Sequence, residues 1–281
     1  MNMEGRLGAL LATQIASTTP VRGGSICEAH RVETVDGRTL FVKTRRNPPP
    51  DFFAVETAGL EWLRSANAVR VPNVVAFDSD FLALDWIEPG PASRAGAEQF
   101  GRALAELHTS GAPSFGWNRN GYIADLPQDN APGDHWTTFV AEHRLLPLVQ
   151  RAVDIGHIDP SATALVGRLC GRLDEFAGPP EPPARLHGDL WSGNVMWARD
   201  GRAWIVDPAA HGGHRETDLA MLCLFGSPDE AVIAAYDETM PLAPGWRDRV
   251  ELHQLQPVLV HAVVFGGSYG PRAVQIMRRY V

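Results

Sequence analysis

The sequence has few cysteines, no long apolar run and a shortage of basic residues. Its three cysteines, Cys27, Cys170 and Cys223, lie far apart and form no CxxC pair, so neither a zinc site nor the disulfide framework of a secreted protein is expected. The longest apolar run, residues 257–265, is short and interrupted by His261. It does not approach the length of a membrane span, and we expect a cytoplasmic protein with no membrane partner.

The charge balance is acidic, with 25 basic and 33 acidic residues giving a net charge of −8. A general nucleic-acid binder is expected to be basic, so we expect no nucleic-acid partner. The 281 residues are 44% hydrophobic, which is enough to build the core of one domain with two lobes. Nothing in the sequence indicates an oligomeric state.

The first part of the chain is rich in expected strands. After a helix near residues 4–16 and a turn-rich stretch at 18–25, strands are expected at 26–35 and 39–44 around an Asp36-Gly37 turn. Asp51 is expected to cap a helix that continues to about Ser65. Two more strands are expected at 74–77 and 81–86.

A Pro/Gly-rich break at residues 88–91 resembles a hinge, and the chain beyond it is mostly helical. Helices are expected at 94–109, 135–153, 159–176, 216–224, 229–238, 245–264 and 272–280. This order predicts an α+β protein with two lobes. Residues 1–87 are expected to form a small antiparallel-sheet lobe that binds a nucleotide, and residues 88–281 a larger, mainly helical lobe that carries catalysis.

The most informative stretch is His-Gly-Asp-Leu-Trp-Ser-Gly-Asn at residues 187–194, followed by Asp207. Kinase-type phosphoryl transfer needs a carboxylate that orients the attacking hydroxyl, for which we assign Asp189. It also needs oxygen ligands for magnesium, for which we assign Asn194 and Asp207. The intervening residues, 195–206, predict a hairpin with a turn at Asp200-Gly201, which returns Asp207 to the side of Asn194.

Residues of the expected sheet lobe complete a nucleotide site. Lys43 lies near the end of a strand, where it can contact phosphates, and Glu56 in the next helix can pair with it. The turn Gly23-Gly24-Ser25 is a candidate phosphate loop because glycines let backbone amides approach an anion. Trp86 and Ile87, at the expected junction between lobes, are candidates for contact with adenine.

Other residues near the motif have structural or acceptor roles. His187 is expected to hold the loop in shape, and Asp218 to brace it through backbone amides. His214, Arg215 and Glu216 follow Asp207 closely and are candidates for the acceptor side, although helix-capping or exposed positions explain them equally well.

These residues resemble the fructosamine (ketosamine) kinase family, an aminoglycoside-phosphotransferase-like branch of the protein-kinase-like fold. The motifs that carry the resemblance are LHGDLWSGN at 186–194, DPA at 207–209, GHRE at 213–216, DLAM at 218–221 and FGGSY at 265–269. The similarity spans nearly the whole chain.

The resemblance implies ATP- and Mg²⁺-dependent phosphorylation of a sugar hydroxyl, typically the 3-hydroxyl, on a fructosyl or ribulosyl amine. The labile product links such enzymes to deglycation. It also implies the roles given above for Asp189, Asn194, Asp207, Lys43 and Glu56.

Trp191 replaces the lysine usual in protein kinases. Only ten residues separate Asp207 from Asp218, so a protein kinase with an activation segment is disfavoured. Trp191 and the GHRE run favour a ketoamine as the substrate. A kinase for another hydroxylated amine, such as an aminoglycoside or a choline-like compound, and a non-enzymatic nucleotide-binding scaffold stay open. The short Gly-Gly-Ser turn departs from the usual phosphate loop, so the contacts of that loop with the nucleotide stay open too.

Overall fold

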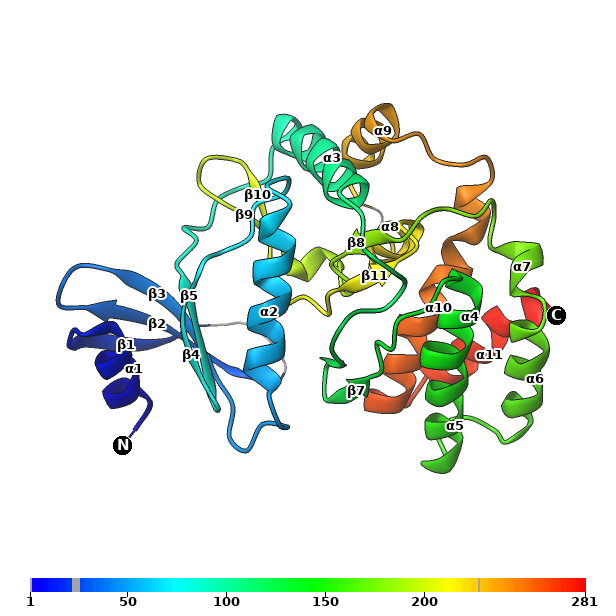
Figure 1. Ribbon diagram of the computed structural model, residues 1–281, viewed down its shortest axis with the longest axis horizontal. Helices are drawn as coiled ribbons and strands as arrows, with labels where there is room; N and C mark the ends of the chain where they lie inside the picture. Colours follow the sequence, from blue (N-terminus) through cyan, green and yellow to red (C-terminus); the bar gives the residue numbers. More distant parts are fainter. Residues whose placement is uncertain (1, 22–25, 227) are drawn as a thin grey trace.

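The computed structural model describes residues 2–21, 26–226 and 228–281, and the Gly23-Gly24-Ser25 turn lies outside them. An antiparallel sheet with the strand order β1-β2-β3-β5-β4 forms one end of the molecule (Figure 1). Its strands are β1 (Ile15–Val21), β2 (Glu28–Thr34), β3 (Thr39–Thr44), β4 (Val74–Asp78) and β5 (Phe81–Asp85). Helix α1 (Met3–Leu11) lies against the sheet, and α2 (Phe52–Ser65) runs between the sheet and the rest of the chain.

The β2–β3 hairpin forms where the sequence predicts it. Gly37 in its turn has a φ of +89°, a conformation that glycine adopts without strain. Val32, Leu40 and Val42 point to one face and pack with Leu7 of α1. The alternation of apolar and polar residues therefore gives this small sheet a core of its own.

The N-terminal prediction is partly wrong. Helix α1 ends at Leu11 because Ala12 adopts the left-handed conformation, and the chain then enters β1 where a helix end and a turn-rich stretch were predicted. Asp51 does precede α2, but its φ is +58° and its side chain makes no capping hydrogen bond, so the predicted cap is also wrong.

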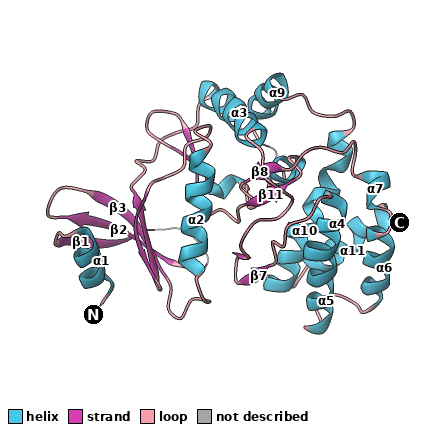
Figure 2. Ribbon diagram, in the orientation of Figure 1, coloured by secondary structure: helices cyan, strands magenta, loops and turns pink. Residues whose placement is uncertain are grey.

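The second lobe is mainly helical, with short two-stranded sheets between the helices (Figure 2). Its helices are α3 (Arg94–Thr109), α4 (Trp136–Val140), α5 (Leu146–Asp154), α6 (Ser161–Cys170), α7 (Leu173–Phe176), α8 (Glu216–Leu222), α9 (Glu230–Thr239), α10 (Trp246–Phe265) and α11 (Tyr269–Arg279). Its strands are β6 (Gly121–Ile123), β7 (Leu126–Gln128), β8 (Ala184–Leu186), β9 (Val195–Trp197), β10 (Ala203–Ile205) and β11 (His211–Gly213). The turn η1 (Ala141–Leu145) joins α4 to α5, and η2 (Ser192–Asn194) precedes β9.

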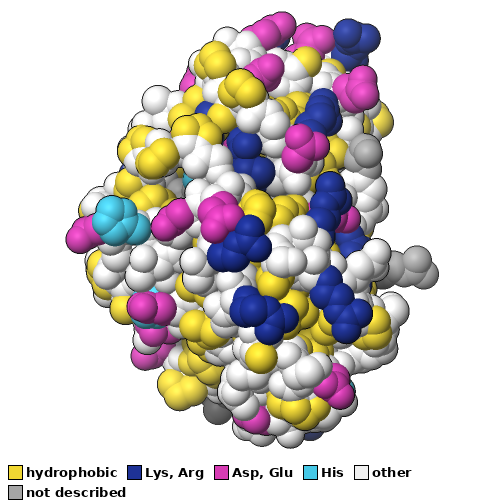
Figure 3. Space-filling view, turned by 90° about the vertical axis from the view of Figure 1, so that its right-hand side faces the viewer, with side chains coloured by type: hydrophobic (Ala, Val, Ile, Leu, Met, Phe, Trp, Pro, Cys, Tyr) yellow, Lys and Arg dark blue, Asp and Glu magenta, His cyan; other side chains and the backbone are white. Residues whose placement is uncertain are grey.

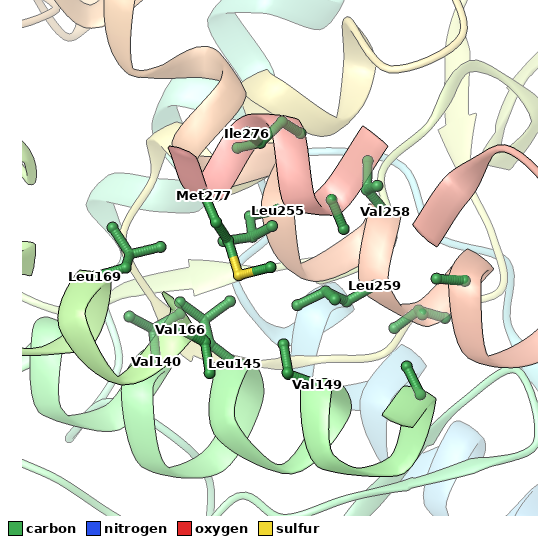
Figure 4. Packing of buried hydrophobic residues seen from close by; sticks show 14 of the residues in the cluster. Val140, Leu145, Val149, Val166, Leu169, Leu255, Val258, Leu259, Ile276 and Met277 are labelled. Atoms are coloured by element: carbon green, nitrogen blue, oxygen red, sulfur yellow. The ribbon is translucent and has the colours of Figure 1, made fainter. Parts of the chain in front are cut away.

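The α4–η1–α5 segment packs with α6, α10 and α11 around one large apolar core (Figure 4). Val149, Val166, Leu259 and Met277 are among the buried side chains that meet there. The segment η1 is a π-helical turn that leads into Pro147. Proline has no N–H to donate to the carbonyl four residues earlier in an α-helix, which accounts for the local change to π-helical geometry before it.

The two lobes share a second core. Phe53 and Leu60 of α2 pack in the same buried cluster as Leu104 of α3, Leu190 of the motif loop and Ile205 of β10. The residues that follow the motif are therefore fixed against both lobes. No helix in the described part of the chain combines the length and the apolar character needed to cross a membrane.

Candidate active site

The β9–β10 hairpin brings Asp207 back to the motif loop, as the sequence predicts. Met196 pairs with Trp204 in the antiparallel register, and Gly201 in the turn has a φ of +76°. The Val206 N–H then donates to the Asn194 carbonyl at 3.1 Å. Asp207 follows with a φ of +55°, which turns its carboxylate into the space between the lobes.

Asp189 and Asn194 are joined directly. The Asn194 side-chain amide donates to the Asp189 carbonyl oxygen at 2.8 Å and to its Oδ2 at 3.2 Å. These bonds fix the amide and leave its oxygen for another partner. Burial, together with the nearby charge of Asp207, raises the pKa of Asp189 to about 8.

Lys43 contacts both carboxylates that the sequence places near it. Its Nζ forms ion pairs with Glu56 of α2 and with Asp207 Oδ1, the latter at 2.7 Å. Burial alone lowers the pKa of Lys43, but Asp207 and Glu56 outweigh it and hold the pKa above its usual value. Burial raises the pKa of Glu56 to about 7, and Lys43 opposes that rise. Lys43 is therefore a protonated cation held between the lobes.

Lys43 is also the only lysine in the chain, because the other 24 of the 25 basic residues are arginines. It is only 6% exposed. The basic side chains on the face of the helical lobe in Figure 3 are accordingly arginines. The sequence therefore singles out Lys43 by its residue type as well as by its position.

Asp218 holds the backbone of the motif loop. Its carboxylate accepts hydrogen bonds from the N–H groups of His187 at 2.7 Å and Gly188 at 2.9 Å. His108 of α3 lies 3.3 Å from the same carboxylate through Nε2, and its Nδ1 lies 2.7 Å from the Tyr236 hydroxyl. The neutral Nε2–H form of His108 satisfies both contacts. Sequence reasoning anticipated the role of Asp218 but not the support from α3 and α9.

His187 holds the same loop from the inside. Its Nε2 donates to the Val206 carbonyl at 2.8 Å, and its Nδ1 accepts the Asp189 N–H at 3.3 Å. Burial lowers the pKa of His187, so the ring is neutral and bridges the motif loop to the end of the hairpin.

A cleft of about 190 Å³ opens between the lobes at these residues. Lys43, Glu56, Asp189, Asn194 and Asp207 all line it. It is also lined by apolar or aromatic residues of both lobes, among them Ala29, Phe41, Phe52, Val55, Tyr122, Ile123 and Trp191. One concave site therefore combines these polar groups with apolar walls from both lobes, which suits a nucleotide and a second ligand.

Trp191 enters this cleft because residue 193 is glycine. A Cβ atom built on Gly193 meets the Trp191 ring at 2.1 Å, so the indole folds over the glycine backbone. The side chain of Trp191 is consequently placed beside the Asp189 loop, on the rim of the cleft.

Trp86 and Ile87 do not line this cleft. The Trp86 N–H donates to the Thr39 carbonyl at 3.3 Å, and its ring lies under the Arg31 guanidinium at 5.5 Å. Ile87 is buried. Their contact with adenine stays a prediction. The backbone N–H of Trp86 already donates to Thr39 of the sheet and is not available to a ligand.

His214, Arg215 and Glu216 are buried away from the cleft. Arg215 forms a two-point ion pair with Glu181, with bonds of 2.7 and 2.8 Å. Glu216 forms a similar pair with Arg249, at 2.8 and 2.6 Å. These bonds tie α8 to the segment before β8 and to α10. None of the three lines the cleft, and Arg215 and Glu216 are paired inside the lobe. Their contact with the acceptor stays a prediction.

Sequence reasoning missed the β6–β7 hairpin, which lines the cleft from the second lobe. The Tyr122 hydroxyl donates to the Pro50 carbonyl at 3.0 Å, and Arg45 pairs with Asp125 at 2.5 Å. Strands of three residues leave too little alternation to detect, and Pro127 lies within one of them. The hairpin therefore ties the helical lobe to the residues that lead from β3 into α2.

Comparisons with known proteins agree on one family. Residues 7–281 match the family model described as fructosamine kinase. The chain is 34% identical over 266 residues to a candidate ketoamine kinase of Enterococcus faecium, covering 93% of this chain and 94% of the relative. It is 32% identical over 280 residues to the chloroplastic protein-ribulosamine 3-kinase of Arabidopsis thaliana, covering 96% and 84%.

Solved structures show the same relationship. The crystal structure of a candidate fructosamine-3-kinase from Thermobifida fusca superposes with a TM-score of 0.92 at 44% identity, covering 99% of this chain and 97% of that one. Choline kinase LicA from Streptococcus pneumoniae, at 14% identity, covers 99% and 98% with a TM-score of 0.64 and shows the shared fold alone. The predicted α+β fold of two lobes, similar to protein kinases, is thus confirmed, and the chain belongs to the fructosamine kinase family.

Proposed function

We propose that this protein is an ATP- and Mg²⁺-dependent kinase that phosphorylates a sugar hydroxyl, the 3-hydroxyl, of fructosyl or ribulosyl amines. The observation that carries the proposal is the convergence of Lys43, Asp189, Asn194 and Asp207 on one cleft. The names of the relatives from Enterococcus faecium and Arabidopsis thaliana support ketoamines as the acceptor class. A role in deglycation follows from the lability of ketoamine 3-phosphates.

The polar residues fit a magnesium nucleotide. The Asn194 amide oxygen and the Asp207 carboxylate are hard oxygen ligands of the kind that Mg²⁺ takes. Bound there, the cation neutralises charge on the phosphates. Lys43, held by Glu56, is the cationic contact for phosphate from the sheet lobe.

Asp189 is the group that acts on the acceptor. Its carboxylate would orient the sugar hydroxyl and receive its proton as the hydroxyl oxygen bonds to the γ-phosphorus of ATP and the bond from that phosphorus to ADP breaks. The raised pKa of Asp189, about 8, makes it a competent proton acceptor. A cation held by Asn194 and Asp207 would lower that pKa, because a nearby positive charge favours the carboxylate, and would thereby favour the ionised base.

The test is ADP release with Mg-ATP and three acceptors: fructosyl-lysine, ribulosyl-lysine and an aminoglycoside. Magnesium-dependent turnover with either ketoamine supports the proposal and ranks the two sugars. Turnover with the aminoglycoside alone assigns the protein to the kinases of other hydroxylated amines. ATP binding without turnover on any acceptor points to the scaffold alternative and overturns the proposal.

A further inference from the structure

A chain of aromatic side chains leads from the cleft to the surface of the helical lobe. We call Trp191, Phe225, His261, Phe265 and Tyr269 the aromatic track. Ring centroids are 5.6 Å apart for Trp191 and Phe225, and 5.3 Å for Phe225 and His261. From His261 the track continues to Phe265 at 5.5 Å and to Tyr269 at 4.9 Å.

The outer members of the track are open to solvent. Phe225 is 47% exposed and Phe265 is 61% exposed. Single exposed apolar residues need no explanation, but a connected set beside a functional cleft does. Phe225 follows α8, while His261 and Phe265 belong to the end of α10 and Tyr269 begins α11.

The local backbone holds these rings together. Gly266 and Gly267 have φ values of +65° and +61°, so the chain reverses sharply between α10 and α11. The reversal places the Tyr269 ring against the His261 ring. His261 lies one helical turn before Phe265 in α10. The His261 ring is itself anchored because its Nδ1 lies 2.7 Å from the Pro257 carbonyl.

The position of the track matches the shape of a ketoamine, an argument that rests on the function proposed above. Three bonds separate the 3-carbon of the sugar from the amine nitrogen, a span of about 4 Å. With the 3-hydroxyl at Asp189, the nitrogen therefore lies within reach of Trp191, two residues further along the loop. The substituent on the nitrogen has to leave the cleft, and the aromatic track lines one way out.

The chemistry of the track selects among amines. A protonated secondary amine is attracted to aromatic faces, and an alkyl chain covers apolar rings. Within the track only His261 can carry a positive charge, and its Nδ1 is engaged with a carbonyl. An α-carboxylate next to the amine therefore finds little to balance it.

We propose that the aromatic track binds the amine half of the substrate, and that it favours ketoamines on an alkyl amine over ketoamines on an α-amino acid. The occupant is a glycated lysine side chain in peptide linkage. The sugar end binds at Asp189, the butyl chain of the lysine lies along Phe225, and the peptide that carries the lysine reaches Phe265.

Two acceptors with the same sugar separate the parts of this proposal. Nα-acetyl-Nε-fructosyl-lysine presents an alkyl chain, and fructosyl-glycine presents a carboxylate in its place. We expect the wild-type protein to prefer the first in kcat/KM. Phe225→Ala and Phe265→Ala should each lower kcat/KM for the first acceptor about 5- to 10-fold. The KM for ATP and kcat/KM for fructosyl-glycine should not change.

Phe77→Ala is the matched control, because Phe77 is 44% exposed on β4 and lies outside the cleft lining. Thermal unfolding of each variant verifies that the fold is kept. Wild-type silence on both acceptors and on the corresponding pair of ribulosyl amines refutes the ketoamine kinase assignment. Wild-type turnover that responds equally to all three substitutions, or to none, refutes the aromatic track alone.

Discussion

Asp218→Asn tests whether one buried carboxylate holds the motif loop. The carboxylate accepts bonds from the N–H groups of His187 and Gly188 and from His108, and it is fully buried. An asparagine offers one acceptor oxygen and sets an amide donor against the remaining N–H. A hydrogen bond to a charged group contributes about 1.5–3 kcal/mol, and an unsatisfied buried donor costs a similar amount. We therefore expect the variant to lose about 3 kcal/mol of its free energy of unfolding.

Urea unfolding followed by circular dichroism measures this loss. With an m-value of about 3 kcal/mol/M for a chain of this size, the midpoint should fall by about 1 M. The kcat should fall at least about 10-fold, because small displacements of catalytic groups cost rate. Asp134→Asn, at an exposed position, is the control and should change neither quantity. An Asp218→Asn protein with the wild-type midpoint and kcat refutes the idea that this carboxylate positions the loop.

Two further predictions concern the buried side chains of Lys43, His211 and His214, and a third concerns the ring of Trp191 on the rim of the cleft. An amine-acylating reagent should leave Lys43 unmodified in the folded protein and label it after unfolding, as mass spectrometry will show, because it is buried and its pKa is raised; labelling of the native protein at Lys43 contradicts the ion pairs. Burial lowers the pKa of His211 and of His214 to about 3, so below pH 6.5 the unfolded chain binds protons that the folded chain does not. The contribution of each ring to the free energy of unfolding should then fall with decreasing pH, by up to about 1.4 kcal/mol per unit. It is measured as the difference between the wild-type profile and that of His211→Gln or His214→Gln, because the raised pKa values of Asp189 and Glu56 act in the opposite direction; profiles that stay parallel between pH 6.5 and 5 speak against buried neutral rings. Gly193→Ala should displace Trp191, whose ring lies 2.1 Å from the new Cβ position, and raise the KM for a ketoamine about 10-fold with the KM for ATP unchanged; unaltered steady-state kinetics exclude a role for Trp191.

Local sequence signals predict the elements that carry the catalytic groups. Helix α3 has the predicted bounds, because Ser93 caps its first turn and apolar residues follow a helical period. The Asp200-Gly201 turn predicts the hairpin that returns Asp207. The spacing of Lys43 and Glu56 predicts their ion pair, because a strand end and the first turns of the next helix face each other in this lobe.

Contacts between segments that lie far apart in the sequence could not be predicted from local signals. Proximity in sequence suggested that His214, Arg215 and Glu216 lie near the acceptor, but their partners, Glu181 and Arg249, come from distant segments. These ion pairs hold Arg215 and Glu216 inside the lobe. Nothing in a single sequence assigns such pairs.

Short strands and unusual backbone angles were missed for a different reason. The pairing of β8 with β11 involves three residues on each side, too few for alternation to appear. The end of α1 depends on a left-handed Ala12, and alanine carries no preference for that conformation. Tertiary packing decides both features.

The most direct test of the account compares phosphoryl transfer and nucleotide binding in Asp189→Asn. Single-turnover transfer from Mg-ATP to fructosyl-lysine is measured beside Mg-ADP binding by calorimetry. The account predicts that transfer slows by about 10²–10⁴-fold, while the affinity for Mg-ADP stays within about threefold because Lys43, Asn194 and Asp207 are intact. Transfer at the wild-type rate would contradict the assignment of Asp189 as the group that activates the acceptor.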